Sequence, residues 1–401
     1  MRNSVKLNRK IAVILALALV ALLWTATSIL AQVTGPCVGC HTMHNSQDGV
    51  QMAVDQNGQP AGPYAKLLRR DGCLGCHKGD YSTSGSAIDA IPKVFSDTAP
   101  TTGTQDYSAG GDFYWVAQAG TAADKKGHNV GYVKAPDGNF GSAPTFPPGY
   151  DNTIIGPGAH ARGPFTVNDV PTQLTCAGTL GCHGDPNVAN DFGALTGAHH
   201  GVENAGGFSD GSTIAKSYRF LYGIKGVESS DWEHTLSPTN HNQYHGDNRN
   251  SNTATDNTTI SHLCCECHGL FHTAGDASFA SPWIRHPTDF DLTNATGTEY
   301  ASYNIESGSV GEYSTLAPVA SDMGALTATA DGTAQIVSDI FGTPPTGVTD
   351  IAIVTCISCH RAHGSEYDDL LRWDYVAGTS AGSGTNTDSG CFVCHTTKDD
   401  N

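Results

Sequence analysis

Charged residues are scarce in this sequence, and basic ones especially so. Only 15% of the 401 residues are charged, whereas an average soluble domain has roughly 25%. Lys and Arg together number 21 against 39 Asp and Glu, which gives a formal net charge of −18. Nucleic-acid-binding surfaces are basic, so this composition excludes that class. The sequence also has no regular alternation of strand and helix patterns and no sustained heptads, which argues against the common α/β and coiled-coil folds.

The N-terminus has the pattern of a secretory signal. Four basic residues precede an apolar run from Ile11 to Trp24, and small residues follow up to Ala31. The run is 14 residues long, shorter than the ~20 needed to span a bilayer. We predict a signal peptide over residues 1–31; the alternative is an uncleaved anchor that continues to Leu30. Its removal changes the net charge from −18 to −22.

The rest of the chain is rich in turn-forming residues and poor in helix signals. It has 47 Gly, yet its 5 Trp, 14 Tyr and 13 Phe argue against disorder. Two short helices are predicted, over residues 64–70 and 366–375, with Gly72 and Gly378 as stops. We therefore predict a mostly irregular fold with a few short helices and little strand. Such long loops are sensible if large prosthetic groups supply the missing core.

Twelve of the 13 cysteines form six pairs, and His follows the second Cys of every pair. Five pairs have the spacing C-x-x-C-H, and the third has C-x5-C-H. The pairs are Cys37/Cys40, Cys73/Cys76, Cys176/Cys182, Cys264/Cys267, Cys356/Cys359 and Cys391/Cys394, followed by His41, His77, His183, His268, His360 and His395. The odd cysteine is Cys265, interpreted as a free or buried thiol because pairing it with Cys267 would leave a single residue between them.

This pattern predicts covalently attached haem c. The two cysteines bond the vinyl groups, and the following His binds the iron. Zinc sites and disulfide scaffolds also use cysteine pairs, but neither calls for a His after every pair. We expect six haems, or five if the C-x5-C-H site is instead a disulfide beside an unrelated His183. The free rotation of Gly178 and Gly181 favours haem there.

The second axial ligand of each iron is predicted to be histidine as well. Only Met43, Met52 and Met323 remain after signal removal, too few for six irons, whereas 12 histidines remain. Such ligation gives low reduction potentials, because a Met ligand is the one that raises them. The distal candidates are His44, His272 and His363, close after a motif His, then His286, His128 and one of His199 and His200. If the backbone after the motif is helical, a His three or four residues on must bind a different iron, which predicts close haem pairs. The surplus histidines, any of which could displace a candidate, are His160, His234, His241, His245 and His262.

The motifs divide the chain into modules, and the two ends resemble each other. In both, a C-x-x-C-H motif leads to a Tyr-x-x-Leu-Leu-Arg segment and a second motif, as at Tyr64–Arg69 and Tyr367–Arg372. The predicted division is a signal peptide (1–31), an N-terminal dihaem module (32–80), a haem-free loop-rich segment (81–170), a central segment with two haems (171–300), a haem-free loop segment (301–355) and a C-terminal dihaem module (356–401).

The motifs at Cys37–Ser46, Gly110–Val116, Lys126–Asn129, Ile284–Pro287 and Cys356–His363 resemble those of the filament-forming hexahaem cytochromes of metal-respiring bacteria, the OmcS type. The resemblance runs in order through most of the mature chain and departs at the C-x5-C-H site. It implies a fold with little regular structure around a continuous haem chain. It also implies a homopolymer in which His44 binds a haem of the next subunit, secreted to the outer cell surface.

The predicted haem sites are compatible with three functions. We expect an electron-transfer protein, not an enzyme, that carries electrons over long range outside the cell to acceptors such as metal oxides or to other cytochromes. A monomeric periplasmic or outer-surface shuttle would differ only in assembly. A multihaem oxidoreductase would need an iron with an open position.

Overall fold

The computed structural model describes residues 37–55, 59–78, 91–100, 108–136, 147–149, 173–195, 199–200, 207–229, 233, 241–247, 256–272, 286, 288–292, 314–321, 352–375 and 390–395. The predicted signal peptide, His160 and His234 lie outside these ranges. Among the described residues, no helix is both long enough and apolar enough to cross a membrane.

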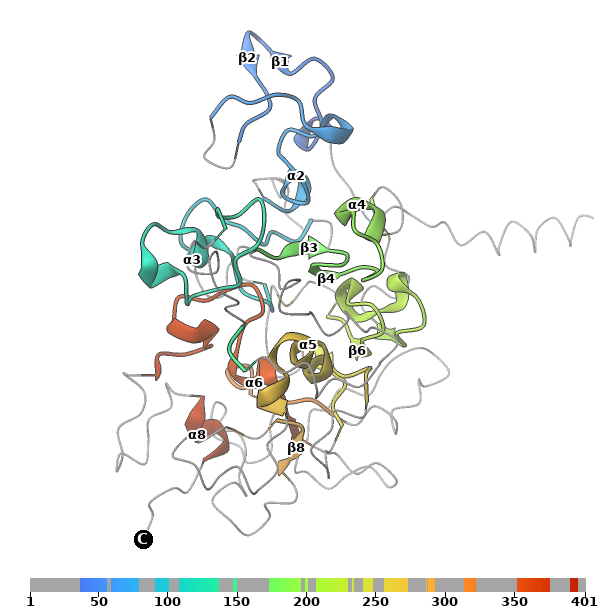
Figure 1. The fold of residues 1–401 in the computed structure, drawn as a ribbon, viewed down its shortest axis with the longest axis vertical. Helices are drawn as coiled ribbons and strands as arrows, with labels where there is room; N and C mark the ends of the chain where they lie inside the picture. The colour runs from blue at the N-terminus through green and yellow to red at the C-terminus, as the bar shows by residue number, and fades with distance from the viewer. Residues whose placement is uncertain are drawn as a thin grey trace, which may run out of the picture.

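Regular structure is sparse, as the sequence predicted (Figure 1). The longest helix is α5, with 13 residues. The helices are α2 (Leu74–His77), α3 (Tyr114–Ala117), α4 (Asp191–Ala194), α5 (Ile260–His272), α6 (Cys356–Cys359) and α8 (Cys391–Cys394). Short 3-10 turns are η1 (Cys37–Gly39), η2 (Ala65–Leu67), η4 (Thr121–Ala123), η6 (Ile214–Lys216), η7 (Tyr218–Phe220) and η10 (Asp368–Leu370).

The strands are two or three residues long and form small separate sheets. They are β1 (Ser46–Gln47), β2 (Val50–Gln51), β3 (Thr175–Ala177), β4 (Gly181–His183), β5 (Phe208–Ser209), β6 (Gly226–Val227), β7 (Gln243–Tyr244), β8 (Phe290–Asp291) and β9 (Ile353–Val354). The pairs β1–β2 and β8–β9 and the three-stranded sheet β5–β6–β7 are antiparallel, and β3–β4 is parallel.

Apolar side chains form three small clusters, two of which contain cysteines of the motifs. One cluster packs Trp373 and Val393 against Cys359, Cys391 and Cys394. Another gathers Phe113 and Val116 with Cys176, and the third surrounds Tyr218 and Ile353. The apolar core is therefore divided among the cysteine sites.

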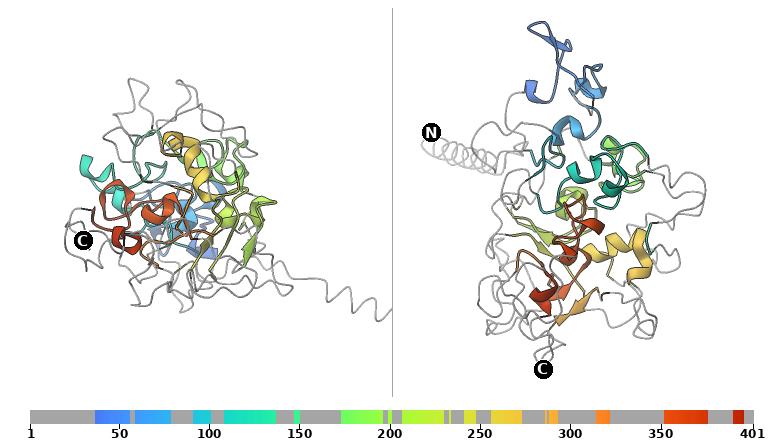
Figure 2. Two further views of the ribbon diagram at one scale, coloured as in Figure 1. Left: turned by 90° about the horizontal axis from the view of Figure 1, so that it is seen from below. Right: turned by 90° about the vertical axis from the view of Figure 1, so that its left-hand side faces the viewer.

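The N-terminal module and helix α8 lie toward opposite ends of the molecule, and α6 lies between them against α5 (Figure 1). Residues 37–69, with β1 and β2, project from one end, and α8 lies near the other (Figures 1 and 2). The two ends therefore differ in structure although their sequences share a repeat. Ends that differ in structure are suited to head-to-tail contacts, which do not close into a ring.

The two helices predicted from the terminal repeat are wrong. Residues 64–70 and 366–375 each contain a single 3-10 turn, over Ala65–Leu67 and Asp368–Leu370. In each turn two successive residues have positive φ, at Lys66 and Leu67 and at Asp369 and Leu370. Backbone pairing with the preceding motif, His41 with Leu68 and His360 with Leu371, overrides the helix propensity of the Leu-Leu-Arg segment.

Candidate haem sites

One turn of backbone brings the two cysteines of a motif to the same side. At four motifs the His N–H donates to the carbonyl of the first Cys, as from His41 to Cys37 at 2.9 Å and from His360 to Cys356 at 3.0 Å; His77 and His395 do the same. The fourth motif lies within α5. Both cysteines therefore face one side of the turn, as the vinyl groups of one porphyrin require.

The C-x5-C-H motif is built differently. Cys176 lies on β3 and Cys182 on β4, and these strands pair in parallel across a loop that begins at Gly178, with Gly181 as the first residue of β4. At Gly178, φ is +81° and a Cβ would lie 2.3 Å from the Val188 carbonyl. This position requires glycine, which keeps the five intervening residues compact.

Five motif histidines face a second histidine from elsewhere in the chain. The ring centroids are 6.1 Å apart for His41 and His199, 6.0 Å for His77 and His200, 6.3 Å for His183 and His363, 6.2 Å for His268 and His128, and 6.2 Å for His395 and His286. Imidazole nitrogen binds a transition metal at about 2 Å. With the ring centroid about 1 Å further out, two imidazoles on opposite sides of one iron lie roughly 6 Å apart. The donor set and its spacing fit a six-coordinate haem iron.

Five of the paired imidazoles, and that of His360, are held by a hydrogen bond from Nδ1 to a backbone carbonyl. The acceptors are Lys66 for His41 (3.1 Å), Pro92 for His77 (2.9 Å), Arg219 for His183 (2.9 Å), Pro148 for His268 (2.6 Å), Ala362 for His128 (2.6 Å) and Asp369 for His360 (2.7 Å). A carbonyl only accepts, so Nδ1 carries the proton. The other ring nitrogen, Nε2, is then the basic one that can bind metal.

Burial favours the neutral imidazole, which is the form that binds metal. Loss of hydration lowers the pKa of His77, His128, His268 and His360. The same cause lowers the pKa of His200 to about 4 and that of His363 to about 3. These rings therefore need no deprotonation before they bind iron at neutral pH.

A left-handed turn supplies the carbonyl at three of the sites. Lys66, Arg219 and Asp369 have φ of 62°, 48° and 59°, and the next residue is also left-handed. The backbone N–H that follows the motif His donates into the same turn in each case, for example from Gly184 to Phe220 at 2.7 Å. The sequence predicts this repeat only at the two ends. The structure has a third copy of the same left-handed turn, at Ser217–Leu221, whose sequence differs from the Tyr-x-x-Leu-Leu-Arg pattern.

Arginine completes the repeat in the terminal modules. Arg69 donates to the carbonyls of Val38 and Gly39, and Arg372 donates to that of Ile357 at 2.7 Å. These carbonyls belong to the residues between the two cysteines. The Tyr-x-x-Leu-Leu-Arg segment therefore holds both the imidazole and the cysteine turn of its own motif.

Cysteines of successive motifs lie next to each other. A hydrogen bond with Cys76 raises the pKa of Cys40, and one with Cys73 raises that of Cys176. In the same way Cys356 raises the pKa of Cys264, which also feels the charge of Cys182. Burial raises the pKa of Cys359 to about 12, and Cys391 adds to it. The six sites thus follow one another in space in their order along the chain.

The segment over residues 91–97 connects the second and third sites. The Pro92 carbonyl accepts from His77, and the Val94 N–H donates to the His77 carbonyl at 3.0 Å. The Val94 carbonyl accepts from Phe113, whose ring stacks on His363 at 4.7 Å between centroids. The strap therefore contacts an imidazole of the second site directly and one of the third site through Phe113.

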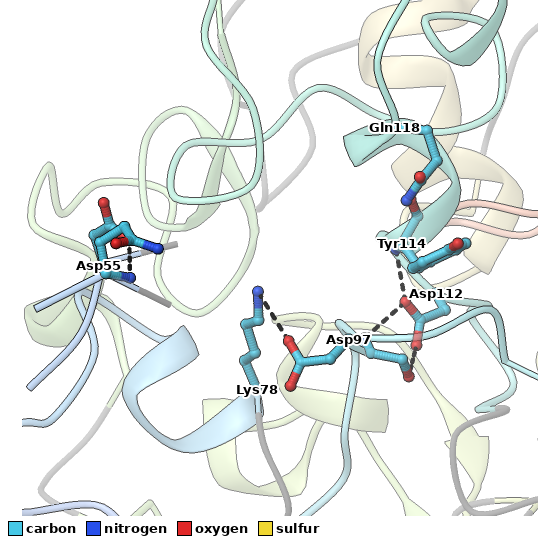
Figure 3. A network of polar contacts seen from close by, with 8 residues as sticks. Asp55, Lys78, Asp97, Asp112, Tyr114 and Gln118 are labelled. Atoms are coloured by element: carbon cyan, nitrogen blue, oxygen red, sulfur yellow. Dashed lines mark hydrogen bonds and ion pairs between the residues drawn. The ribbon is translucent and has the colours of Figure 1, made fainter. Parts of the chain in front are cut away.

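Polar contacts of Asp112 and Lys78 hold this strap (Figure 3). The Asp112 carboxylate, 0% exposed, accepts from the Ser96 N–H and hydroxyl and from the Tyr114 N–H. Lys78, next to His77, places its ammonium 3.4 Å from Asp97 and 3.8 Å from the centre of the Phe95 ring. Loss of hydration raises the pKa of Asp112 and lowers that of Lys78.

Several histidines lie outside the five pairs. His44 is exposed at the projecting end of the molecule, and the side chain of His272 lies outside what the structure describes. Among the described side chains, no histidine ring faces His360 at the 6 Å spacing. Of the surplus histidines, His245 binds Asp256 through Nε2 at 2.8 Å. His241 and His262 are buried outside the five pairs.

Sequence reasoning expected only one of His199 and His200 near an iron, whereas each faces a motif His. Adjacent side chains do point in different directions when the backbone is not helical, and His199 has a φ of 55°. A helix after the first and fifth motifs, which would have placed His44 and His363 one turn from the motif His, is not present, because the residues after His41 and His360 are not helical.

Comparison with known proteins gives a consistent family of matches. Residues 351–400 match the family model of the doubled CXXCH motif. The sequence is 26% identical to C-type cytochrome OmcS of Geobacter sulfurreducens over 406 residues, covering 92% of this chain and 86% of that protein. The Outer Membrane Cytochrome S filament from the same organism is 22% identical with a TM-score of 0.39, covering 86% of this chain and 84% of that one. The OmcS nanowires are 20% identical with a TM-score of 0.36, covering 91% and 93%.

Proposed function

We propose that the chain is a hexahaem c-type cytochrome that conducts electrons outside the cell, assembled as a filament of identical subunits. The observation that carries this is the set of five imidazole pairs with centroids 6.0–6.3 Å apart. Homology to C-type cytochrome OmcS along nearly the whole chain supports it. When bound, haem c supplies an iron that gains and loses one electron.

The protein's own residues prepare the sites for electron transfer in three ways. The cysteines of each motif set the position of the porphyrin edge. The paired imidazoles would each hold one side of a bound iron, which would leave no open position for a substrate. Cys40 lies next to Cys76, and Cys73 next to Cys176, so haems attached at these cysteines would lie close together. Electrons can then pass along the sites in chain order.

We further propose that His44 is the sixth ligand of the fifth site in a neighbouring subunit. Among the described side chains, no histidine ring faces His360 at the spacing of the other five pairs. His44 is exposed in residues 37–69, which project from one end of the molecule, whereas α6, which precedes His360, lies in its middle (Figure 1). A bond from His44 to that site would join subunits head to tail, and the contact would repeat without closing.

Optical and EPR spectra of the purified protein test the electron-transfer function. We expect six low-spin haems that do not change on addition of cyanide or nitrite, together with an intact mass that includes six haems. A high-spin centre that binds these anions would instead favour an oxidoreductase with an open iron. A colourless protein would refute the proposal altogether.

Substitution of His44 tests the assembly. His44→Ala is expected to leave six haems attached but to make one of them high-spin and to abolish filaments in electron micrographs. His245→Asn is the matched control, because the Nε2 atom of His245 is engaged by Asp256. Wild-type protein that forms no filaments would favour the monomeric shuttle. Filaments in the His44→Ala variant would show that another contact joins the subunits.

A further inference from the structure

The same turn contacts the motif histidine at three sites, but the charge of its first residue differs. Lys66, Arg219 and Asp369 occupy equivalent left-handed positions, and each accepts a hydrogen bond from its imidazole through the backbone carbonyl. Their side chains therefore start from the same point relative to the iron ligand. The position carries a cation at the first and third sites and an anion at the fifth.

Neighbouring groups neutralise the charge at the third site. The Arg219 guanidinium lies 3.7 Å from the Glu228 carboxylate, whose side chain is 1% exposed, and donates to Asn242 at 2.8 Å. Arg219 and Glu228 together carry no net charge. The first and fifth sites are thus the informative pair, with Lys66 and Asp369 both exposed.

At the fifth site Asp369 is the residue in contact with the imidazole. Its carbonyl oxygen lies 2.7 Å from Nδ1 of His360, so the Asp369 side chain branches from the backbone next to the iron ligand. The adjacent Asp368 has a different partner, Lys125, whose ammonium lies 2.6 Å away. Of the two neighbouring carboxylates, Asp368 is paired with a cation, and Asp369 belongs to the residue that contacts the iron ligand.

Two physical effects then separate the first site from the fifth. A negative charge beside the iron stabilises the oxidised state, which carries one more positive charge, and a positive charge stabilises the reduced state. A stronger hydrogen bond from Nδ1 makes the imidazole a more basic ligand, which also favours oxidised iron. The bond is 3.1 Å at Lys66 and 2.7 Å at Asp369. Both effects act in the same direction.

We propose that the first residue of this turn sets the relative reduction potentials of the sites, so that the Lys66 site is more easily reduced than the Asp369 site. The inference rests on the proposed haem-bound function. If His44 joins subunits at the fifth site, the electron crosses each junction through a site held at low potential. The turn residue would then control how readily electrons pass between subunits.

Two neutral variants test the proposal by spectropotentiometric titration of the full-length protein. In Asp369→Asn one of the six components should move to a more positive potential, and in Lys66→Asn one should move to a more negative potential. Asn adopts left-handed backbone readily, so the turn is retained. The control is Asp368→Asn, which removes the same charge one residue away and should give a smaller shift than Asp369→Asn.

The outcomes separate this inference from the proposed function. Unchanged titration curves in protein that carries six low-spin haems would overturn the inference alone, as would an equal shift in Asp368→Asn. Wild-type protein without haem would overturn both. If Asp369→Asn does not accumulate, Asp369→Lys replaces it, because lysine occupies the equivalent position in the first module. Exposed charges are screened by salt, so the shifts should shrink at high ionic strength. A shift that persists in 1 M salt would contradict the charge mechanism.

Discussion

Asp112 offers a sharp test of how the backbone holds two sites together. Its Oδ1 accepts from the Ser96 N–H at 3.1 Å and the Tyr114 N–H at 2.7 Å, and its Oδ2 accepts from the Ser96 hydroxyl at 2.6 Å. Asp112→Ala would leave two backbone N–H groups buried without partners, at about 1–3 kcal/mol each, and would lose the bond to the hydroxyl. Relief of the buried charge offsets part of this. We expect a loss of about 3–5 kcal/mol in unfolding free energy.

Asp112→Asn is the matched variant. The amide oxygen can accept from both N–H groups, and the amide nitrogen can donate to the Ser96 oxygen, so all three bonds remain. We expect its stability to lie within about 1 kcal/mol of wild type. Guanidinium chloride unfolding, followed by the haem absorbance, measures both variants. Equal losses in the two variants, or no loss in Asp112→Ala, would refute the argument that hydrogen bonds and not charge secure the strap.

The pH dependence of the unfolding free energy gives a second comparison, between wild type and Asp112→Asn. Burial raises the pKa of Asp112, so the folded protein holds this proton more tightly than the unfolded chain, whose Asp pKa is about 4. The resulting stabilisation is complete below the unfolded pKa and is lost as pH rises through the folded one. Wild type should therefore gain stability relative to Asp112→Asn as the pH is lowered from 7 towards 4. A constant difference over that range would contradict the assignment.

Three further predictions concern other parts of the sites. Gly111→Ala should lower the unfolding free energy by more than about 3 kcal/mol, since φ is +78° and the Cβ would lie 1.9 Å from the Gly364 carbonyl oxygen. Gly49→Ala, with φ of +81° and open space around it, should lower it by about 1–2 kcal/mol. Equal losses of stability in thermal unfolding would contradict the clash. Cys265→Ala should leave the intact mass at six haems, and the loss of a haem would show that Cys265 is the attachment residue in place of Cys264. His245→Asn should leave all haems low-spin in EPR, because its Nε2 is bound to Asp256; a new high-spin signal would assign it as a ligand.

The fold class could be predicted from the sequence. At each site the motif cysteines and their His were easier to predict than the histidine that faces them. A motif Cys and its His are a few residues apart, so covalent chemistry alone constrains their spacing. The facing histidine can come from anywhere in the chain: His199 is far from His41, and His128 far from His268. Counting histidines suggested such partners, but only the folded backbone brings particular rings to 6 Å. The propensity of Leu-Leu-Arg for helix likewise concealed two left-handed residues, because propensity carries no information on the carbonyl that an imidazole requires.

The short elements of this fold follow from what each imidazole needs. A ring that binds iron through Nε2 needs an acceptor at Nδ1, and a helix or strand interior has already used its carbonyls in its own ladder. Left-handed turns such as Lys66–Leu67 and Asp369–Leu370 release a carbonyl from any ladder and direct it at the ring. Each left-handed non-glycine residue costs roughly 1–2 kcal/mol, so the turns are retained only because backbone pairing to the motif and the imidazole bond offset that cost. Longer helices or strands at these positions would remove the acceptor. The irregular backbone is therefore a requirement of ligand orientation at these sites and not a failure to form regular structure.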